Sequence, residues 1–347
     1  MTISLLFVVR TNDAASVNYS FSANSGVAQS AGMLVDALTE KKITAVAATV
    51  SALDDILYVV DLHKPTHVII ETLWLTSDEM QSLITAFPEV TFIARDHSES
   101  CFRVLEVDSS QRIIDYLKMG VEVMSNSVRS MTDIIAVATA IGADTNLASY
   151  GPNVYPVPDE SDMVPHTRSD SEVNIGCFGA VRTMKNHITQ AIAAIQFAQW
   201  ENLSLKFHIN SYDIPGYVDP VLNNLRFLFA NTNNAELVEH GWMTREDFLK
   251  VIAGMDICSQ VSFTETFNIV TADAMSQAVP IIASDSIAWI GASARRRCES
   301  MIDIACGFQE IWKETSTEQT TRLKRQRADM SVYVNDALTV WTNKFGS

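Results

Sequence analysis

Short apolar runs rich in β-branched residues alternate with longer amphipathic segments along almost the whole chain. Such alternation is typical of βα units built on a parallel sheet. It occurs twice, and residues 156–173, with three prolines among acidic and hydroxyl residues, separate the two occurrences. The pattern therefore predicts an α/β protein with two Rossmann-like, doubly wound parallel-sheet domains.

Each half supplies a similar set of expected elements. In the first half we expect strands at 3–9, 43–50, 67–72, 90–96 and 121–125, with helices at 26–39, 53–63, 77–87, 111–119 and 127–140. In the second half we expect strands at 173–178, 204–209, 235–239, 256–260 and 280–283, with helices at 187–200, 220–230, 245–253, 268–277, 293–302 and 318–343.

The domain boundaries follow from these elements. We expect an N-terminal domain over 1–155, a linker over 156–173, a second domain over 174–315, and a last helical segment, 316–347, that crosses back to the first domain. Ligands of doubly wound sheets collect at the carboxyl ends of the strands. A cleft faced by both domains is the expected site.

Composition narrows the class of protein. The 347 residues are 47% hydrophobic and 19% charged, which suffices for a large core and excludes a disordered chain. The 41 acidic and 25 basic residues give a formal charge of −16, which argues against a surface built throughout to neutralise nucleic acid. Residues 1–160 carry 9 basic and 20 acidic residues (9 − 20 = −11), so the second half is the less acidic one.

Cysteine usage and hydropathy predict the compartment. Five widely spaced cysteines without a C-x-x-C pair signal neither a disulfide framework nor a zinc site. The first residues lack a basic leader, and no apolar run reaches membrane-spanning length. We expect a cytoplasmic protein without integral membrane association.

The first chemical motif is a strand, a polar turn and a helix start over 256–277. The turn runs from Ser262 through Glu265 to Asn268, and the helix continues past Asp273. A helix N-terminus favours anions through its free N–H groups and its dipole. Glu265 and Asp273 are two helical turns and a little more apart, so both carboxylates could line one ligand. The alternative is a carboxylate that only favours the helix N-terminus and a solvated aspartate.

A second strand, turn and helix start lies at 173–200. Gly179 ends the strand, Arg182 and Lys185 follow in the turn, and the helix begins after Asn186. A guanidinium fork and an ammonium at the end of a strand suit a diphosphate. The glycines do not form a G-x-G-x-x-G fingerprint, and an exposed turn with solvated cations is the alternative.

Together the two motifs resemble the retaining, GT-B-type glycosyltransferases of glycosyltransferase family four. That family carries a glycine, then Arg and Lys-Asn, and later a Ser-x-x-Glu-x-Phe segment with a second acid eight residues after the first. The matching residues are Gly179, Arg182, Lys185, Asn186, Ser262, Glu265, Phe267 and Asp273, and the likeness is best over 173–286. Asp273 stands where glutamate is usual, and Asn268 and Ala278 stand where glycine is common.

The resemblance implies roles for these positions. Arg182 and Lys185 would stabilise the diphosphate of a nucleotide sugar, Glu265 would contact the donor sugar, and Asp273 would bind the ribose. The turn at Trp242 and Met243 would hold the nucleobase. The full implied donor set is Gly26, Gly179, Asn186, Trp242, Met243, Thr266, Phe267, Asn268, Ile269 and Asp273.

The first domain offers acceptor-side residues at its strand ends. Gly26 follows Ser25 at a helix start, where a glycine lets a ligand approach the backbone. His97 follows the strand at 90–96 and resembles the family's acceptor-side histidine. Asp96, Ser98 and Glu71 would line the acceptor pocket, although a lone histidine after a strand is as often a capping or packing residue.

The expected activity is retaining transfer of a hexosyl or pentosyl group from a nucleotide-diphosphate sugar to an acceptor hydroxyl. No bound cofactor is expected: the co-substrate would be a UDP sugar, with GDP and ADP sugars as alternatives. No metal is expected, since no Asp-x-Asp pair ends a strand and Arg182 and Lys185 would supply the neutralising charge.

The acceptor and the oligomeric state stay open. A small metabolite, a lipid head group or a glycan precursor would serve as acceptor. A hydroxymethylated DNA base is the alternative, because the basic runs at 295–297 and 322–327 suit a polyanion. Further alternatives are a sugar-nucleotide epimerase, a phosphorylase, and a non-catalytic relative that only binds the nucleotide or a partner protein.

Overall fold

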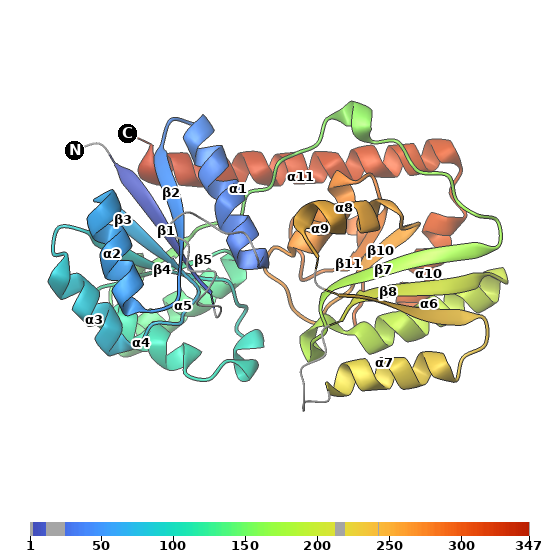
Figure 1. Ribbon diagram of the computed structural model, residues 1–347, viewed down its shortest axis with the longest axis horizontal. Helices are drawn as coiled ribbons and strands as arrows, with labels where there is room; N and C mark the ends of the chain where they lie inside the picture. The colour runs from blue at the N-terminus through green and yellow to red at the C-terminus, as the bar shows by residue number, and fades with distance from the viewer. Residues whose placement is uncertain (1–2, 12–24, 212–218, 242, 347) are drawn as a thin grey trace. The chain divides into compact units, whose positions relative to one another are not determined.

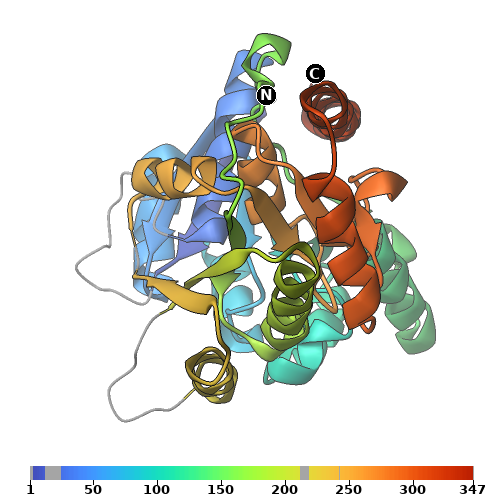
Figure 2. The ribbon, with the colours of Figure 1, turned by 90° about the vertical axis from the view of Figure 1, so that its right-hand side faces the viewer.

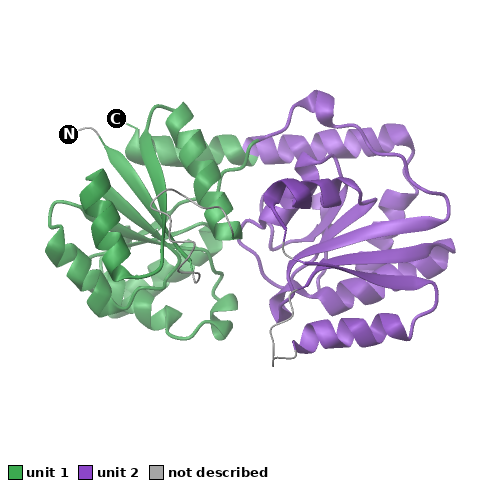
Figure 3. Ribbon diagram, viewed as in Figure 1, with its two compact units in different colours: residues 1–156, 333–347 green, residues 157–332 purple. Residues whose placement is uncertain are grey.

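The computed structural model describes residues 3–11, 25–211, 219–241 and 243–346 (Figure 1). The chain divides into two compact units, coloured separately in Figure 3: unit 1 is residues 1–156 with 333–347, and unit 2 is residues 157–332. Each unit contains a six-stranded sheet in which the neighbouring strands run parallel.

Unit 1 is a doubly wound sheet in the strand order β2-β1-β3-β4-β5-β6. Its elements are β1 (Ser4–Arg10), α1 (Gly26–Glu40), β2 (Thr44–Val50), α2 (Leu53–His63), β3 (His67–Glu71), α3 (Ser77–Ala86), β4 (Thr91–Asp96), α4 (Ser109–Lys118), β5 (Glu122–Ser125), α5 (Val128–Ile141) and β6 (Ala148–Tyr150). The main core lies between the sheet and α2 to α5. The strands β1, β3 and β4 inside the sheet are buried on both faces, which explains their continuous apolar runs.

Unit 2 has the strand order β12-β11-β10-β7-β8-β9. Its elements are β7 (Glu172–Ala180), α6 (His187–Glu201), β8 (Ser204–Asn210), α7 (Pro220–Ala230), β9 (Ala235–His240), α8 (Arg245–Ala253), β10 (Ile257–Gln260), α9 (Ile269–Ser276), β11 (Ile281–Ser284), β12 (Arg295–Arg296) and α10 (Met301–Trp312). Helices α6, α7 and α10 cover one face, with α6 and α10 side by side (Figure 2). Helix α8 packs on the other face through Phe248 against Phe178.

The last helix, α11 (Ser316–Phe345), belongs to both units: 316–332 to unit 2 and 333–345 to unit 1. In unit 1 its Trp341 is 1% exposed, packs on Phe7 of β1 and donates from Nε1 to the carbonyl oxygen of Pro152 at 2.8 Å. In unit 2 its Leu323 is fully buried against Met163 and Ala278. No helix among the described residues is both long and apolar enough to cross a membrane.

The predicted alternation is confirmed, with three differences in detail. Strands β6 and β12 were not expected, because three and two residues are too short to show a periodicity. The helix expected at 293–302 is wrong. Arg295 and Arg296 form an edge strand beside β11, and α10 begins only at Met301, after Ser300 caps it by accepting from the amide of Asp303.

One buried histidine should make folding sensitive to acid. Burial lowers the pKa of His187, the first residue of α6, from 6.5 to about 4, so the native protein keeps it neutral. Between pH 6.5 and 4 the unfolded chain binds a proton that the native state does not, so stability falls as the pH drops. For this group alone we expect a loss of about 2 kcal/mol between pH 7 and pH 5.

Urea unfolding at both pH values checks this expectation. The His187→Gln variant, neutral at both, should lose about 2 kcal/mol less than the wild type over the same interval. Equal losses in the two proteins would contradict the buried neutral imidazole.

Candidate functional site

The order of strands in unit 2 places its switch point between β7 and β10, the neighbours from which the chain winds in opposite directions. Ligands of doubly wound sheets bind where the loops from such strands diverge. The loop after β7 carries Arg182 and Lys185, and the loop after β10 carries Ser262 and Glu265. Residues from both sequence motifs therefore meet at this edge.

The contact between the two loops is an ion pair. Nζ of Lys185 lies 2.6 Å from Oε1 of Glu265, and the two side chains are 23% and 10% exposed. Arg182 is exposed in the same loop. The edge thus presents a partly buried carboxylate with one cation against it and a second cation in solvent.

Local backbone conformation explains the shape of the β7 loop. Gly179 has a φ of 103°, which a residue with a Cβ rarely adopts. Asn186 is also left-handed, with φ 58°, and is 4% exposed. Its Nδ2 donates to the carbonyl oxygens of Val261 at 3.0 Å and Cys298 at 2.8 Å. The Asn186 amide therefore ties the β7 loop to the β10 loop, and its small exposure leaves little surface for a ligand.

Two residues that stand where glycine is common in the family adopt the left-handed backbone conformation that glycine would favour. Asn268 has φ 59° and Ala278 has φ 55°, so both lie in the left-handed region. Asparagine tolerates that region better than other residues with a side chain. Oδ1 of Asn268 also caps α9 by accepting from the amide of Thr271 at 2.9 Å, and its Nδ2 donates to Gln260.

The left-handed conformation predicts an unusual order of stabilities at Asn268. Both Asn268→Ala and Asn268→Gly remove the cap and the Gln260 contact, but only alanine also has the steric cost of positive φ. We expect the alanine variant to be less stable by about 1 kcal/mol. Chemical denaturation measures the difference.

Asn335, exposed within α11, provides the matched control. There the order should reverse, because alanine favours a helix interior by about 1 kcal/mol over glycine. If Asn268→Ala proved as stable as Asn268→Gly, backbone conformation would not be what selects asparagine at this position.

The other predicted donor residues of unit 2 differ in exposure. Asp273 is 1% exposed and paired with Arg245, a residue that no sequence motif singled out. Phe267 is 2% exposed and stacks on Trp289 at 5.6 Å, so it belongs to the core under the turn. Thr266, Ile269 and Met243 are half-buried, and Trp242 lies outside the described residues.

A buried charged cluster lies at the carboxyl ends of the strands of unit 1. Glu71 ends β3 and is fully buried; Oε1 accepts from Nη1 of Arg95 at 2.9 Å, and Oε2 contacts Nε2 of His97. Burial would raise the pKa of Glu71, but Arg95 and then His97 lower it below its usual value. Glu71 therefore stays ionised and holds the His97 ring, which is 11% exposed.

Arg95 is the residue of this cluster that sequence reasoning missed. It is fully buried, donates from Nε to the carbonyl oxygen of Gly151 at 3.0 Å and from Nη2 to Oδ1 of Asn153 at 2.5 Å, and lies over the Trp341 ring. An arginine inside an apolar strand was the available signal. Thr72, after Glu71, has φ 69°, a strained conformation for a β-branched residue.

Three more predicted residues of unit 1 shape backbone turns. Asp96 is 2% exposed; it accepts from the amide of Ser98 at 3.0 Å and from Nη2 of Arg103 at 2.5 Å. The Ser98 hydroxyl donates to Glu106 at 2.7 Å. These contacts engage the Asp96 and Ser98 side chains in fixing the loop after β4. His97 is therefore the residue of this loop whose side chain is best placed to meet a ligand. Gly26 opens α1, capped by Ser25.

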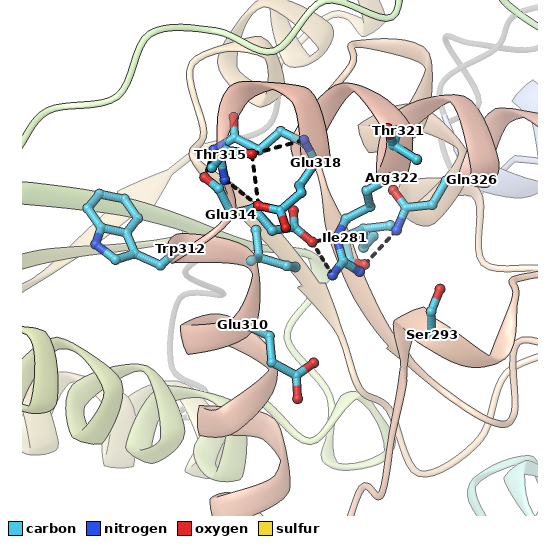
Figure 4. Close-up of polar contacts among 12 residues, drawn as sticks. Ile281, Ser293, Glu310, Trp312, Glu314, Thr315, Glu318, Thr321, Arg322 and Gln326 are labelled. Atoms are coloured by element: carbon cyan, nitrogen blue, oxygen red, sulfur yellow. Dashed lines mark hydrogen bonds and ion pairs between the residues drawn. The ribbon is translucent and has the colours of Figure 1, made fainter.

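The basic runs are largely engaged by partners within unit 2. Arg295 donates to backbone carbonyls, Arg296 pairs with Glu310, and Arg327 donates to the carbonyl oxygen of Pro158. Arg322 binds Oε1 of Glu314 through both Nε and Nη2 beside a cavity of about 220 Å³ (Figure 4). These contacts do not favour a polyanion surface, so the DNA alternative gains no support from them.

No group of three or more metal-ligating side chains is found in the described part of the chain. Charged groups at the carboxyl ends of the strands form ion pairs, among them Lys185 with Glu265 in unit 2 and Arg95 with Glu71 in unit 1.

The fold has clear counterparts among solved structures. No family model and no curated protein sequence matches the chain. Two units, each with a six-stranded parallel sheet wound in both directions, form the GT-B architecture, and the predicted GT-B fold is confirmed by glycosyltransferase structures that match nearly the full length.

Three of these structures illustrate the match. Alr3699/HepE of Anabaena, solved with UDP and glucose, has a TM-score of 0.65 at 13% identity over 97% of each chain. The α,α-trehalose-6-phosphate synthase of Burkholderia multivorans has 0.67 at 10%, covering 99% of this chain and 97% of its own. The E. coli trehalose-6-phosphate protein bound with UDP-2-fluoro glucose has 0.63 at 10% over 96% of each. At these identities the likeness concerns the fold.

Proposed function

We propose that the protein is a retaining glycosyltransferase that uses a nucleotide-diphosphate sugar. The observation that carries this proposal is the Lys185–Glu265 pair at the switch point of unit 2, with Arg182 exposed in the loop that holds Lys185, in a chain with the GT-B fold. A UDP sugar is the proposed donor, because similar folds were solved with UDP or with a UDP sugar.

Unit 2 would hold the donor. Breaking the anomeric bond builds negative charge on the departing diphosphate, and preorganised cations stabilise that charge most effectively. Arg182 supplies a guanidinium fork, Lys185 a point charge, and the N-terminus of α9 a favourable dipole. Glu265, held by Lys185 in the free protein, would accept hydrogen bonds from the donor sugar.

Unit 1 would hold the acceptor, with His97 orienting it. Both oxygens of Glu71 are engaged, so Glu71 is a positioning residue that fixes the ring and does not contact the acceptor. In the retaining reaction the acceptor oxygen bonds to the anomeric carbon as the bond from that carbon to the diphosphate oxygen breaks. The acceptor proton passes to the departing phosphate oxygen, so no separate base is required.

Thermal unfolding with UDP, GDP and ADP tests the donor site. A ligand that binds only the native state raises the melting temperature, by an amount equivalent to about 2.7 kcal/mol at a hundred times its Kd. We expect UDP to raise it and Arg182→Ala to weaken that effect without changing the melting temperature of the free protein. If none of the three nucleotides shifted the transition, the proposed function would be overturned.

A further inference from the structure

Arg245 and Asp273 form an ion pair that joins the start of α8 to α9 in unit 2. Nη2 of Arg245 donates to Oδ1 of Asp273 at 2.7 Å. The arginine side chain is 26% exposed and the aspartate side chain 1%. The carboxylate is therefore enclosed, and the arginine is the member of the pair whose side chain solvent reaches.

Asp273 lies in α9, which packs on the strands β10 and β11 of the sheet. Burial raises the pKa of the Cys258 thiol on β10, and the charges of Cys177 and Asp273 raise it further. The aspartate side chain is one methylene shorter than the glutamate usual in the family.

Arg245 occupies a position that is unfavourable for a cation. It is the first residue of α8, and the dipole of a helix disfavours positive charge at its N-terminus. The neighbouring acids Glu246 and Asp247 are paired with Lys250. Among the described residues, Asp273 places a carboxylate against the Arg245 guanidinium.

We infer that Arg245 is a nucleotide-binding residue whose guanidinium donates to the ribose hydroxyls of the donor, and that Asp273 is the positioning residue that holds it. This inference rests on the proposed function and changes the role that the family resemblance gives to Asp273. A guanidinium has five donors in a rigid fork, and hydroxyl oxygens accept from them. The long arginine side chain would reach the ribose, which the short aspartate side chain would not.

Calorimetric titration with UDP and 2′-deoxy-UDP tests the inference. A hydrogen bond from a charged donor favours UDP by about tenfold or more in Kd. We expect this preference in the wild type and its near disappearance in Arg245→Lys, which keeps the charge against Asp273 but removes the fork. The double variant Arg245→Met/Asp273→Asn removes both charges at similar volume and should also lose the preference.

Arg129→Met is the matched control, because Arg129 pairs with the nearly buried Glu99 in unit 1. It should keep the wild-type preference. Folded Arg245 variants that still prefer UDP about tenfold would overturn the inference and leave the proposed function standing, as would a wild type that binds both nucleotides equally. A wild type that binds neither would overturn the proposed function, and the inference with it.

Discussion

Replacing Lys185 by glutamine should reduce the rate of sugar transfer by about 10²- to 10³-fold, the usual effect of removing one preorganised electrostatic contact to a developing anion. Nζ of Lys185 lies 2.6 Å from Glu265 at the switch point of unit 2, where the diphosphate would depart. Glutamine can still donate to Glu265, so the variant removes the charge and keeps a partner for the carboxylate.

Steady-state kinetics with a UDP sugar and its acceptor, or donor hydrolysis in the absence of an acceptor, measures this effect. Lys206→Gln is the control. Lys206 pairs with Glu172 at 3.0 Å in the same sheet, near the amino ends of β8 and β7. It should retain wild-type turnover. Normal turnover in Lys185→Gln would remove Lys185 from the catalytic machinery, and unchanged turnover in Arg182→Ala would do the same for Arg182.

Replacing Arg95 by methionine should lower the free energy of unfolding by about 3–5 kcal/mol, because it leaves the Glu71 charge buried without its main partner. Both side chains of this pair are fully buried. The carbonyl oxygen of Gly151 and Oδ1 of Asn153 would also lose a donor. Urea denaturation at neutral pH measures the loss.

Two further variants distinguish two causes of the lost stability: leaving a charge buried without a partner, and breaking an ion pair of any kind. Arg226→Met breaks the exposed pair with Glu239 and should cost at most about 1 kcal/mol. Arg95→Met/Glu71→Gln removes both buried charges and should recover part of the stability lost in Arg95→Met. If Arg95→Met cost no more than Arg226→Met, the cluster would not depend on charge compensation.

The parts of the candidate site whose residues lie close together in the sequence could be predicted. Gly179, Arg182 and Lys185 share one turn, and Ser262 and Glu265 share another, so spacing alone placed them at strand ends. Neither the contact between Lys185 and Glu265 nor the burial of Asp273 could be predicted. The first joins residues 80 positions apart, and the second depends on how α8 packs beside α9.

The sequence by itself determined the two α/β halves, most strand and helix positions and the loops that carry charge, because hydrophobic periodicity and turn chemistry act over a few residues. Only the tertiary structure decided which charges are enclosed and which face solvent. Arg95 and Arg245 are missing from every local motif, yet they hold Glu71 and Asp273 across 24 and 28 residues. The basic runs, conspicuous in sequence, are largely engaged by partners within unit 2. Burial and pairing depend on contacts between distant segments, which no local pattern records.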